Sequence, residues 1–283
     1  MKKMFLAVLS YAAFCPLFAQ VPVSFTRLWE SDTLLRIPES VLYNPQNDLL
    51  LVTNMNEIHD NEADGDGFIS LLKLSGDIEN LHWITGLNDP KGMAIHGRKL
   101  YVGDLSELVE IDLETAMIVK KYAPAGARFF NDVTVSGDGV VYVSDSFDNK
   151  VYRLKDGKME VWLEGALLDM PNGLLAEKDR VLVANMNQGK IYTVNPRNKK
   201  AELWTKEIPK VDGIATDSKG VYLASNWEGE VYYLNAKGEN WKVLDTRSAN
   251  INAADLTYVE KGDFWVVPTF FGNKVVAYKV QKK

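Results

Sequence analysis

A short sequence phrase recurs six times along the chain. In each copy a polar residue occupies the same position, just before an apolar run. The phrases read IPESVLY, DPKGMAI, FFNDVTV, MPNGLLA, KVDGIAT and NAADLTY. We call these residues the anchors: Glu39, Lys91, Asn131, Asn172, Asp212 and Asp255. Apart from one lysine they offer only oxygen ligands, and Glu39, Asn172 and Asp212 together would neutralise a hard divalent cation. Brought together, the anchors predict a cation site; polar residues that merely line a water-filled channel are the alternative.

The elements that must position the anchors follow from their spacing. The phrases recur at intervals of about 40–45 residues, with one longer first interval, which is typical of β-propeller blades. The third unit reads DVTVS, VVYVSDS, VYRL and MEVWLE between Gly/Asp/Asn turns, which predicts four strands. We therefore expect an all-β fold, a six-bladed β-propeller, in which the anchors meet at one rim of the central channel.

Closure of the ring is predicted from both ends of the chain. The sixth unit offers three strands, LTYVE, DFWVVPT and KVVAYKV, and then the chain ends. Near the other end, Trp29 precedes Glu39 at the spacing with which outer-strand aromatics precede the anchors of other blades. We therefore expect residues 25–29 to supply the missing outer strand of blade six, which leaves no open sheet edge at the join.

Composition and the N-terminus limit the function classes. The chain has 283 residues, a net charge of −6 and no Lys/Arg run, which argues against nucleic acid as a partner. Residues 1–19 form a basic start and an apolar stretch, which predicts a signal peptide and a periplasmic or extracellular location. The single cysteine, Cys15, lies inside it after Phe14, which does not suit a lipoprotein. Residues 20–283 form one predicted domain without an apolar stretch long enough to span a membrane.

The motifs around the anchors resemble the senescence marker protein/gluconolactonase/luciferin-regenerating enzyme family. The resemblance covers the mature chain and depends on the ordered set PES, FND, PNG and VDG in blades one, three, four and five. It implies that Glu39, Asn172 and Asp212 bind one divalent cation and that Asn131 contacts substrate or a metal-bound water. The sequence departs from sugar lactonases at Phe129, where those enzymes carry a substrate-binding arginine. Lys91 and Asp255 are also outside the family pattern.

These observations predict a metal-dependent hydrolase of a lactone or related small ester. Ca²⁺ is the expected ion, ahead of Mg²⁺, Mn²⁺ or Zn²⁺. Asp212 is the first candidate for the general base and Asp255 the second, while Asn131, Lys91 and Phe129 would contact substrate. The alternative is a non-enzymatic propeller, because several phrases also resemble NHL-type repeats that bind ligands or proteins. The oligomeric state stays open.

Two further groups of residues have predicted positions. Asn54, Asp104, Asp145, Asn185 and Asn226 end the second strands, where we expect them to cap the hairpin turns that follow. Several large apolar residues lie near strand ends on the same rim as the anchors, and each is either core or a wall of an apolar pocket: Met55, Phe129, Phe130, Met170, Met186 and Trp227. The acidic insertion at residues 56–68 follows the second strand of blade one and is expected beside the channel mouth.

Overall fold

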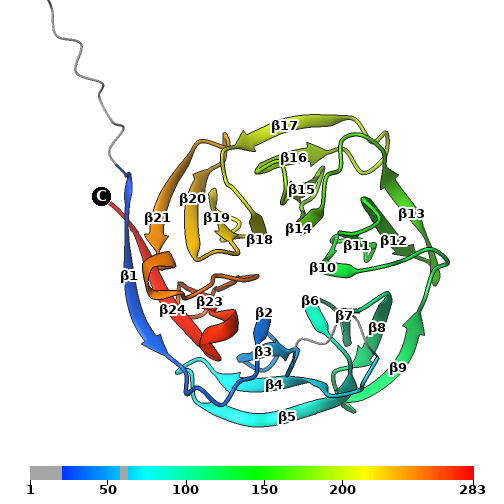
Figure 1. Ribbon diagram of the computed structural model, residues 1–283, viewed down its shortest axis with the longest axis horizontal. Coiled ribbons are helices and arrows are strands. Elements are labelled where there is room, and N and C mark those ends of the chain that lie inside the picture. The colour runs from blue at the N-terminus through cyan, green and yellow to red at the C-terminus, as the bar shows by residue number, and fades with distance from the viewer. Residues whose placement is uncertain (1–20, 58–62) are drawn as a thin grey trace, which may run out of the picture.

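The repeating phrases fold into six four-stranded antiparallel sheets, or blades, that surround a central channel (Figure 1). The computed structural model describes residues 21–57 and 63–283, and the predicted signal peptide at residues 1–19 lies outside the described residues. Apart from two short 3₁₀ helices, the described elements are strands. The predicted all-β fold and the six-bladed propeller are confirmed.

The first three blades each use four consecutive strands, numbered from the channel outward. Blade one holds β2 (Pro38–Asn44), β3 (Leu49–Asn54), β4 (Gly67–Lys73) and β5 (Ile78–Leu87). Blade two holds β6 (Pro90–His96), β7 (Lys99–Asp104), β8 (Glu107–Asp112) and β9 (Met117–Tyr122). Blade three holds β10 (Phe130–Val135), β11 (Val141–Asp145), β12 (Lys150–Lys155) and β13 (Lys158–Glu164).

The remaining blades repeat this order until the chain ends in blade six. Blade four holds β14 (Pro171–Ala176), β15 (Val181–Asn185), β16 (Lys190–Val194) and β17 (Ala201–Lys206). Blade five holds β18 (Val211–Thr216), β19 (Val221–Asn226), β20 (Glu230–Asn235) and β21 (Asn240–Asp245), followed by η1 (Arg247–Ala249). Blade six holds β22 (Thr257–Val259), β23 (Phe264–Pro268) and β24 (Val275–Lys282), with η2 (Phe270–Gly272) between the last two, and its outer strand is β1 (Val23–Glu30).

The hydrophobic core lies between neighbouring blades and not around the channel. Six large clusters of buried apolar side chains each join strands of two adjacent blades. In blade three, for example, Tyr142 and Trp162 pack with Val183 and Val194 of blade four. Because each sheet buries both faces against its neighbours, the middle strands read as nearly continuous apolar runs. The polar side chains are left for the channel and the two outer faces.

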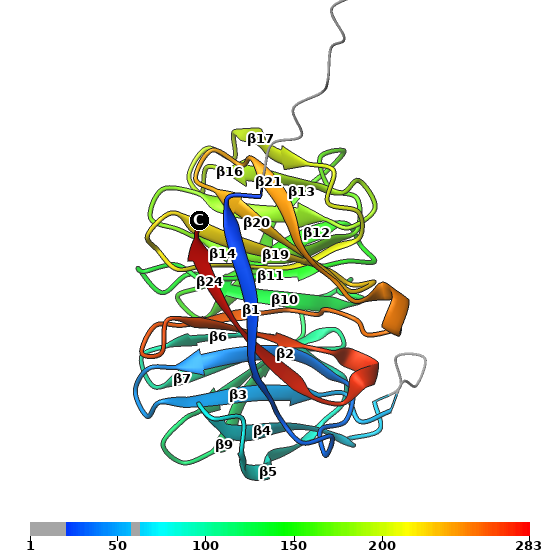
Figure 2. The same cartoon turned by 90° about the vertical axis from the view of Figure 1, so that its left-hand side faces the viewer.

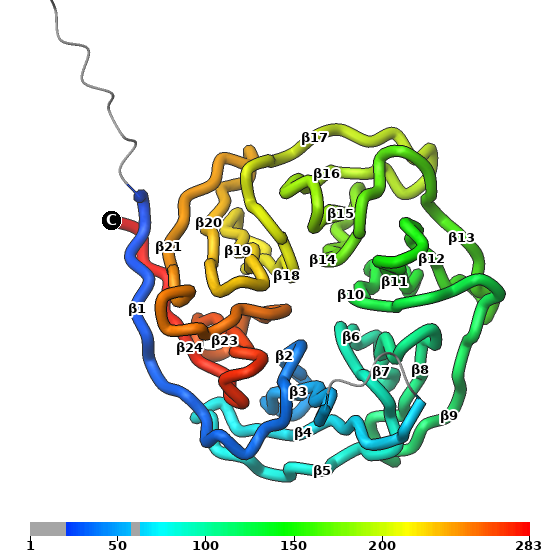
Figure 3. Tube along the Cα trace, viewed as in Figure 1, coloured from blue at the N-terminus to red at the C-terminus, as the bar shows by residue number. Residues whose placement is uncertain are grey.

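Strand β1 closes the ring as predicted. It pairs antiparallel with β24 from Val23, opposite Lys282, to Glu30, opposite Val276. Phe25 stacks on Tyr278 with ring centroids 4.5 Å apart. Figures 2 and 3 show the blue N-terminal strand lying along the red C-terminal segment. Both ends of the chain therefore complete one sheet.

Glycines let the innermost strands approach one another closely around the channel. The residue after the anchor is Gly92 in blade two, Gly173 in blade four and Gly213 in blade five. A Cβ atom built on Gly213 would stand 2.6 Å from the Cα of Asp255, in the next blade. At Gly173 it would strike the backbone of Asp212. The glycine of each PKG, PNG or VDG phrase is therefore required by close backbone packing.

Replacing Gly213 by alanine should lower the free energy of unfolding by about 1–3 kcal/mol, because the added methyl group overlaps the backbone of the next blade. The matched control is Gly137→Ala, since a Cβ atom there meets nothing within 4 Å and its φ is not positive. The control should change stability by no more than about 0.5 kcal/mol. Urea denaturation of both variants measures the difference, and equal midpoints would contradict this account of the glycine.

Candidate metal site at the channel rim

Five of the six anchors lie together at one end of the central channel. Each is the second residue of an innermost strand and lies where the register shifts against the second strand, which marks a bulge. Figure 1 shows these strands, β2, β6, β10, β14 and β18, arranged around the channel. All five side chains are buried, with exposed fractions of 2–8%: Glu39, Lys91, Asn131, Asn172 and Asp212. The fold therefore unites residues from five blades in one ring.

The sixth anchor was assigned one residue too far along the chain. Asp255 forms a parallel bridge with Ser40, the residue after Glu39, and its backbone N–H donates to the Glu39 carbonyl at 3.0 Å. The position equivalent to Glu39 is therefore Ala254, which is fully buried. Asp255 accepts a 2.6 Å hydrogen bond from Ser40 Oγ and lines a cavity of about 310 Å³ in the other half of the channel. It lies one layer below the ring.

Two of the three predicted metal ligands offer unpartnered oxygen atoms in the ring, and the third contacts one of them. Asn172 donates from Nδ2 to Asp212 Oδ1 at 2.5 Å, so these two side chains are in direct contact. Among the described residues, Glu39 Oε2 and Asp212 Oδ2 are buried oxygen atoms without a hydrogen-bond partner. A buried carboxylate oxygen without a partner is energetically unfavourable. The two oxygens are therefore candidates for binding a positively charged ligand.

Electrostatics in the ring also favour a bound cation. Burial, followed by the charge of Asp212, raises the pKa of Glu39 well above its usual value, and the Lys91 ammonium opposes this. Burial and the charge of Asp255 raise the pKa of Asp212 to about 8. The charged forms are disfavoured because like charges share a site with little water. A divalent cation would remove that repulsion.

The backbone is strained in the three blades that carry these ligands. Two residues before the anchor, Ile37, Met170 and Lys210 have φ angles of 47°, 56° and 46°. Positive φ is uncommon for residues other than glycine and rare for a β-branched residue such as isoleucine. The strain coincides with Glu39, Asn172 and Asp212 and does not occur at the equivalent Asp89 and Phe129. Such strain clusters at functional sites, where it fixes side-chain placement.

The predicted substrate contacts surround the ligands. Lys91 donates from Nζ to the Asp89 carbonyl at 3.1 Å and lies 4.5 Å from the centroid of the Phe129 ring. Burial lowers the pKa of Lys91, while Glu39 and Asp89 raise it. Asn131 donates from Nδ2 to Ser146 Oγ at 3.3 Å. The structure thus brings all three predicted substrate contacts to the ring.

Buried side chains at the ends of the second strands hold the anchor loops. The predicted capping of the next turn occurs at Asp145, which also accepts from the Asp148 N–H at 3.1 Å, and at Asn226, and it is wrong for the other three. The side chains at these strand ends accept hydrogen bonds from the backbone N–H three residues before the anchor, at 2.8–2.9 Å in blades one to four. The acceptors are Asn54, Asp104, Asp145 and Asn185. Blade five differs because Pro209 has no N–H to donate there. Its Asn226 instead accepts from Glu228 in the following turn, as predicted.

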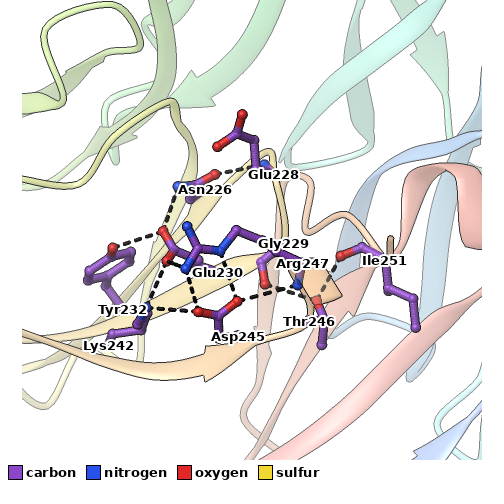
Figure 4. Close-up of polar contacts among 10 residues, drawn as sticks. All are labelled: Asn226, Glu228, Gly229, Glu230, Tyr232, Lys242, Asp245, Thr246, Arg247 and Ile251. Carbon is purple, nitrogen blue, oxygen red and sulfur yellow. Dashed lines mark hydrogen bonds and ion pairs between the residues drawn. The ribbon is translucent and has the colours of Figure 1, made fainter. Parts of the chain in front are cut away.

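A charged network fixes the loop that leads from blade five to Ala254. At its centre the buried carboxylate of Glu230 accepts from Lys242 at 2.9 Å and Arg247 at 2.8 Å (Figure 4). Thr246 Oγ1 donates to the Ile251 carbonyl at 2.7 Å and ties the two ends of the loop (Figure 4). The network therefore positions the residues that enter the ring from blade six.

Three polar residues at the site were missed by sequence reasoning. Asp132, next to Asn131, accepts backbone hydrogen bonds from Val133 and from Leu174 of blade four. Asp89 is buried two residues before Lys91. Ser146 donates at 2.6 Å to the carbonyl of Pro171, directly before Asn172. Comparing the same position in every phrase would have pointed to Asp132 and Asp89.

The donor set fits one divalent cation that is held by few protein ligands. Two carboxylates and one amide supply hard oxygen donors, which suit Ca²⁺, Mg²⁺ or Mn²⁺ better than Zn²⁺. In the described part of the chain, no group of three or more His, Cys, Asp and Glu side chains is arranged to hold a metal ion. A cation here would depend on the Asn172 amide and leave positions for water and substrate. The ammonium group of Lys91 offsets part of the negative charge of the ring.

The six blades define a β-propeller, and several solved structures are similar in fold to this chain. A putative gluconolactonase and a gluconolactonase from Xanthomonas campestris each match 92% of the chain with a TM-score of 0.69 and 16% identity. They are covered over 93% and 90% of their own length. Streptogramin B lyase matches with a TM-score of 0.66 and 12% identity, over 92% of this chain and 97% of its own.

The same fold occurs in a chain that was solved as part of a protein–protein complex. A chain of a nidogen/laminin complex matches 75% of this protein with a TM-score of 0.65 and 14% identity, over 86% of its own length. No protein-family model matches the sequence, and neither does any curated protein. The comparisons therefore establish a gluconolactonase-like propeller fold, and function must be argued from the site. In the described residues, no helix is both long and apolar enough to cross a membrane.

Proposed function

We propose that the protein is an exported, divalent-metal-dependent hydrolase of a lactone or related small ester. The observation that carries this proposal is the pair of buried, unpartnered carboxylate oxygens, Glu39 Oε2 and Asp212 Oδ2, in one ring with Asn172. The ordered motifs and the gluconolactonase-like fold support it. The predicted signal peptide supports a periplasmic or extracellular location.

Each residue of the ring has a role in this proposal. Glu39, Asn172 and Asp212 would hold a cation, which supplies Lewis acidity for a carbonyl oxygen and lowers the pKa of water. Asp212 would bind the cation through one carboxylate oxygen and accept the proton of the attacking water with the other. Lys91 places an ammonium group beside the carbonyl oxygen, where negative charge develops. Asn131 orients the substrate, and Asp255 acts through its charge on Asp212.

The proposal is tested by metal analysis of the purified protein and a panel of lactones with and without chelator. We expect about one Ca²⁺ or Mn²⁺ per chain, loss of hydrolysis with chelator, and recovery when the ion is restored. Undiminished hydrolysis in chelator would contradict the role of the metal. A chain that retains no cation and hydrolyses no lactone would favour the alternative, a binding propeller.

A further inference from the structure

The channel mouth above the ring is built from matching pairs of residues in successive blades. One member lies two residues before the anchor and the other directly follows the second strand. Backbone hydrogen bonds of 3.0–3.2 Å join the pairs Met55–Ile37, Ser146–Phe129, Met186–Met170 and Trp227–Lys210. Most members are apolar, and they come from blades one, three, four and five: Ile37, Met55, Phe129, Met170, Met186 and Trp227.

Aromatic side chains stand on opposite sides of this mouth. In blade three, Phe129 stacks on Phe147 with centroids 4.2 Å apart, and Phe147 is 40% exposed. Blade six lies across the channel from blade three (Figure 1). There Trp227 of blade five packs edge-on against Phe270 and Phe271, and Phe271 is 53% exposed. Exposed aromatic rings around one opening mark a binding surface more often than scattered apolar residues do.

The side of blade six is apolar down to the ring. Ala254 occupies the anchor position and packs in one cluster with Met55 and Phe270, against which Ile37 and Trp227 also lie. Beside this cluster, a cavity of about 450 Å³ lies between blades five and six. It is lined by Trp227, Glu228, Arg247, Asn250, Asn252 and Phe271. This volume is sufficient for a substituent of a phenyl or short alkyl kind. Its apolar contacts would come from Trp227 and Phe271, because the other four lining residues are polar or charged.

The polar groups near the mouth are largely engaged within the protein. Asn252 donates to the Trp227 carbonyl at 2.8 Å, and Lys210 pairs with Glu228 at 2.5 Å. Arg128 donates to the Phe147 carbonyl at 3.3 Å. Ser146 donates to Pro171. A polyhydroxylated sugar ring needs a hydrogen-bond partner for each hydroxyl that it removes from water, and these groups could supply only the capacity that their present bonds leave.

We propose that the lactone carries an aromatic or alkyl substituent, which lies between the aromatic walls while its carbonyl meets the charged ring. This substrate class rests on the hydrolase function proposed above. The apolar group gains from burial against Phe129, Trp227 and Phe271. Phe129 also covers the Lys91 ammonium, with the ring centroid 4.5 Å from Nζ.

Binding calorimetry with lactams tests this proposal without turnover. The probes are a phenyl-substituted δ-lactam and a polyhydroxylated sugar lactam, each titrated into full-length mature protein with Ca²⁺ present. We expect the phenyl lactam to bind at least about tenfold more tightly. Trp227→Ala and Phe271→Ala should each weaken its binding by about tenfold or more. The matched control is Leu203→Ala, since Leu203 is 51% exposed on the outer strand of blade four.

The outcomes separate this proposal from the hydrolase function. Equal or tighter binding of the sugar lactam overturns the apolar substrate class, and so does unchanged binding in Phe271→Ala, whose exposed side chain can be removed without loss of core. If the phenyl lactam binds as expected but no lactone is hydrolysed with any metal, the hydrolase function fails and the preference for an apolar ligand stands. Weakening in Leu203→Ala equal to that in Phe271→Ala would also count against the site.

Discussion

Replacing Asp212 by alanine is expected to lower the affinity for Ca²⁺ or Mn²⁺ by at least about 100-fold and to abolish most lactone hydrolysis. Substitutions in the outer shell of metal sites already cost about 10–100-fold, and Asp212 would be a direct ligand. The change also removes the proposed general base, so the rate of hydrolysis should fall further than the loss of bound metal alone explains. Calorimetric titration of the purified variant with each ion, beside lactone hydrolysis, measures both effects.

Thermal melts distinguish this loss from simple unfolding. Without metal, burial and the charge of Asp255 disfavour the charged form of Asp212. Removing the Asp212 carboxyl group therefore relieves this repulsion, although Asn172 loses one hydrogen-bond acceptor. We therefore expect Asp212→Ala to melt near the parent in chelator. Added Ca²⁺ should stabilise the parent, as any ligand of the folded state does, and leave the variant unchanged.

Asn131→Ala is the matched control within the ring. It removes a buried polar side chain of similar size that contacts Ser146 and is not a proposed ligand. We expect it to keep the ion and to raise KM. If Asp212→Ala binds metal as tightly as the parent, the site has been placed wrongly.

Much of the fold is encoded locally and could be predicted. Each blade repeats four short strands between turns, so the period reveals both the blade and the number of blades. Closure was predictable because Trp29 keeps the aromatic spacing of the other outer strands. In the structure it contacts Phe264 edge-on and lies where any side chain at Gly76 would collide with it.

The error at blade six shows why the ring was harder to predict. The phrase NAADLTY was aligned on its polar residue, Asp255, although the apolar residue directly after it, Leu256, packs in the core and fixes the register. Leu256 is the equivalent of Val41, and counting back from it gives Ala254 as the anchor. Polar residues are weak markers of register, because one residue along a strand changes which layer a side chain occupies.

The supports of the site depend on contacts between distant segments. Asn54 and Asp104 end second strands, where a capping role is the local expectation, yet they bind loops that lead to the anchors. Of these loop contacts, the sequence alone reveals only that blade five must differ, because Pro209 has no N–H to donate. The unpartnered oxygens of Glu39 and Asp212 likewise emerge from packing that one sequence does not reveal.

Removing residues 21–30 is expected to destabilise the whole ring. The deletion takes away β1, which pairs with β24 along its length, and it leaves that strand as an open edge prone to association. It also removes Val23, which is 2% exposed in the core between blades five and six, and Trp29 from the cluster between blades six and one. Burial of such side chains contributes about 1.5–3 kcal/mol each, so we expect the free energy of unfolding to fall by at least about 3 kcal/mol.

The deletion can be separated from a general effect of shortening the chain. Leu28→Ser keeps the strand and alters a side chain that is 48% exposed, so it should melt like the parent. A synthetic peptide of residues 21–31 should restore stability to the deleted protein by adding a strand to β24, since main-chain hydrogen bonds supply much of the affinity in such pairing. Because a fall of 3 kcal/mol lowers Tm by at least about 6 °C in a domain of this size, melts with and without peptide resolve the effect. Near-native melting of the protein that lacks residues 21–30 would show that the ring closes without β1. The pairing of the N- and C-terminal strands would then not be needed to hold Ala254 of blade six beside Glu39 of blade one.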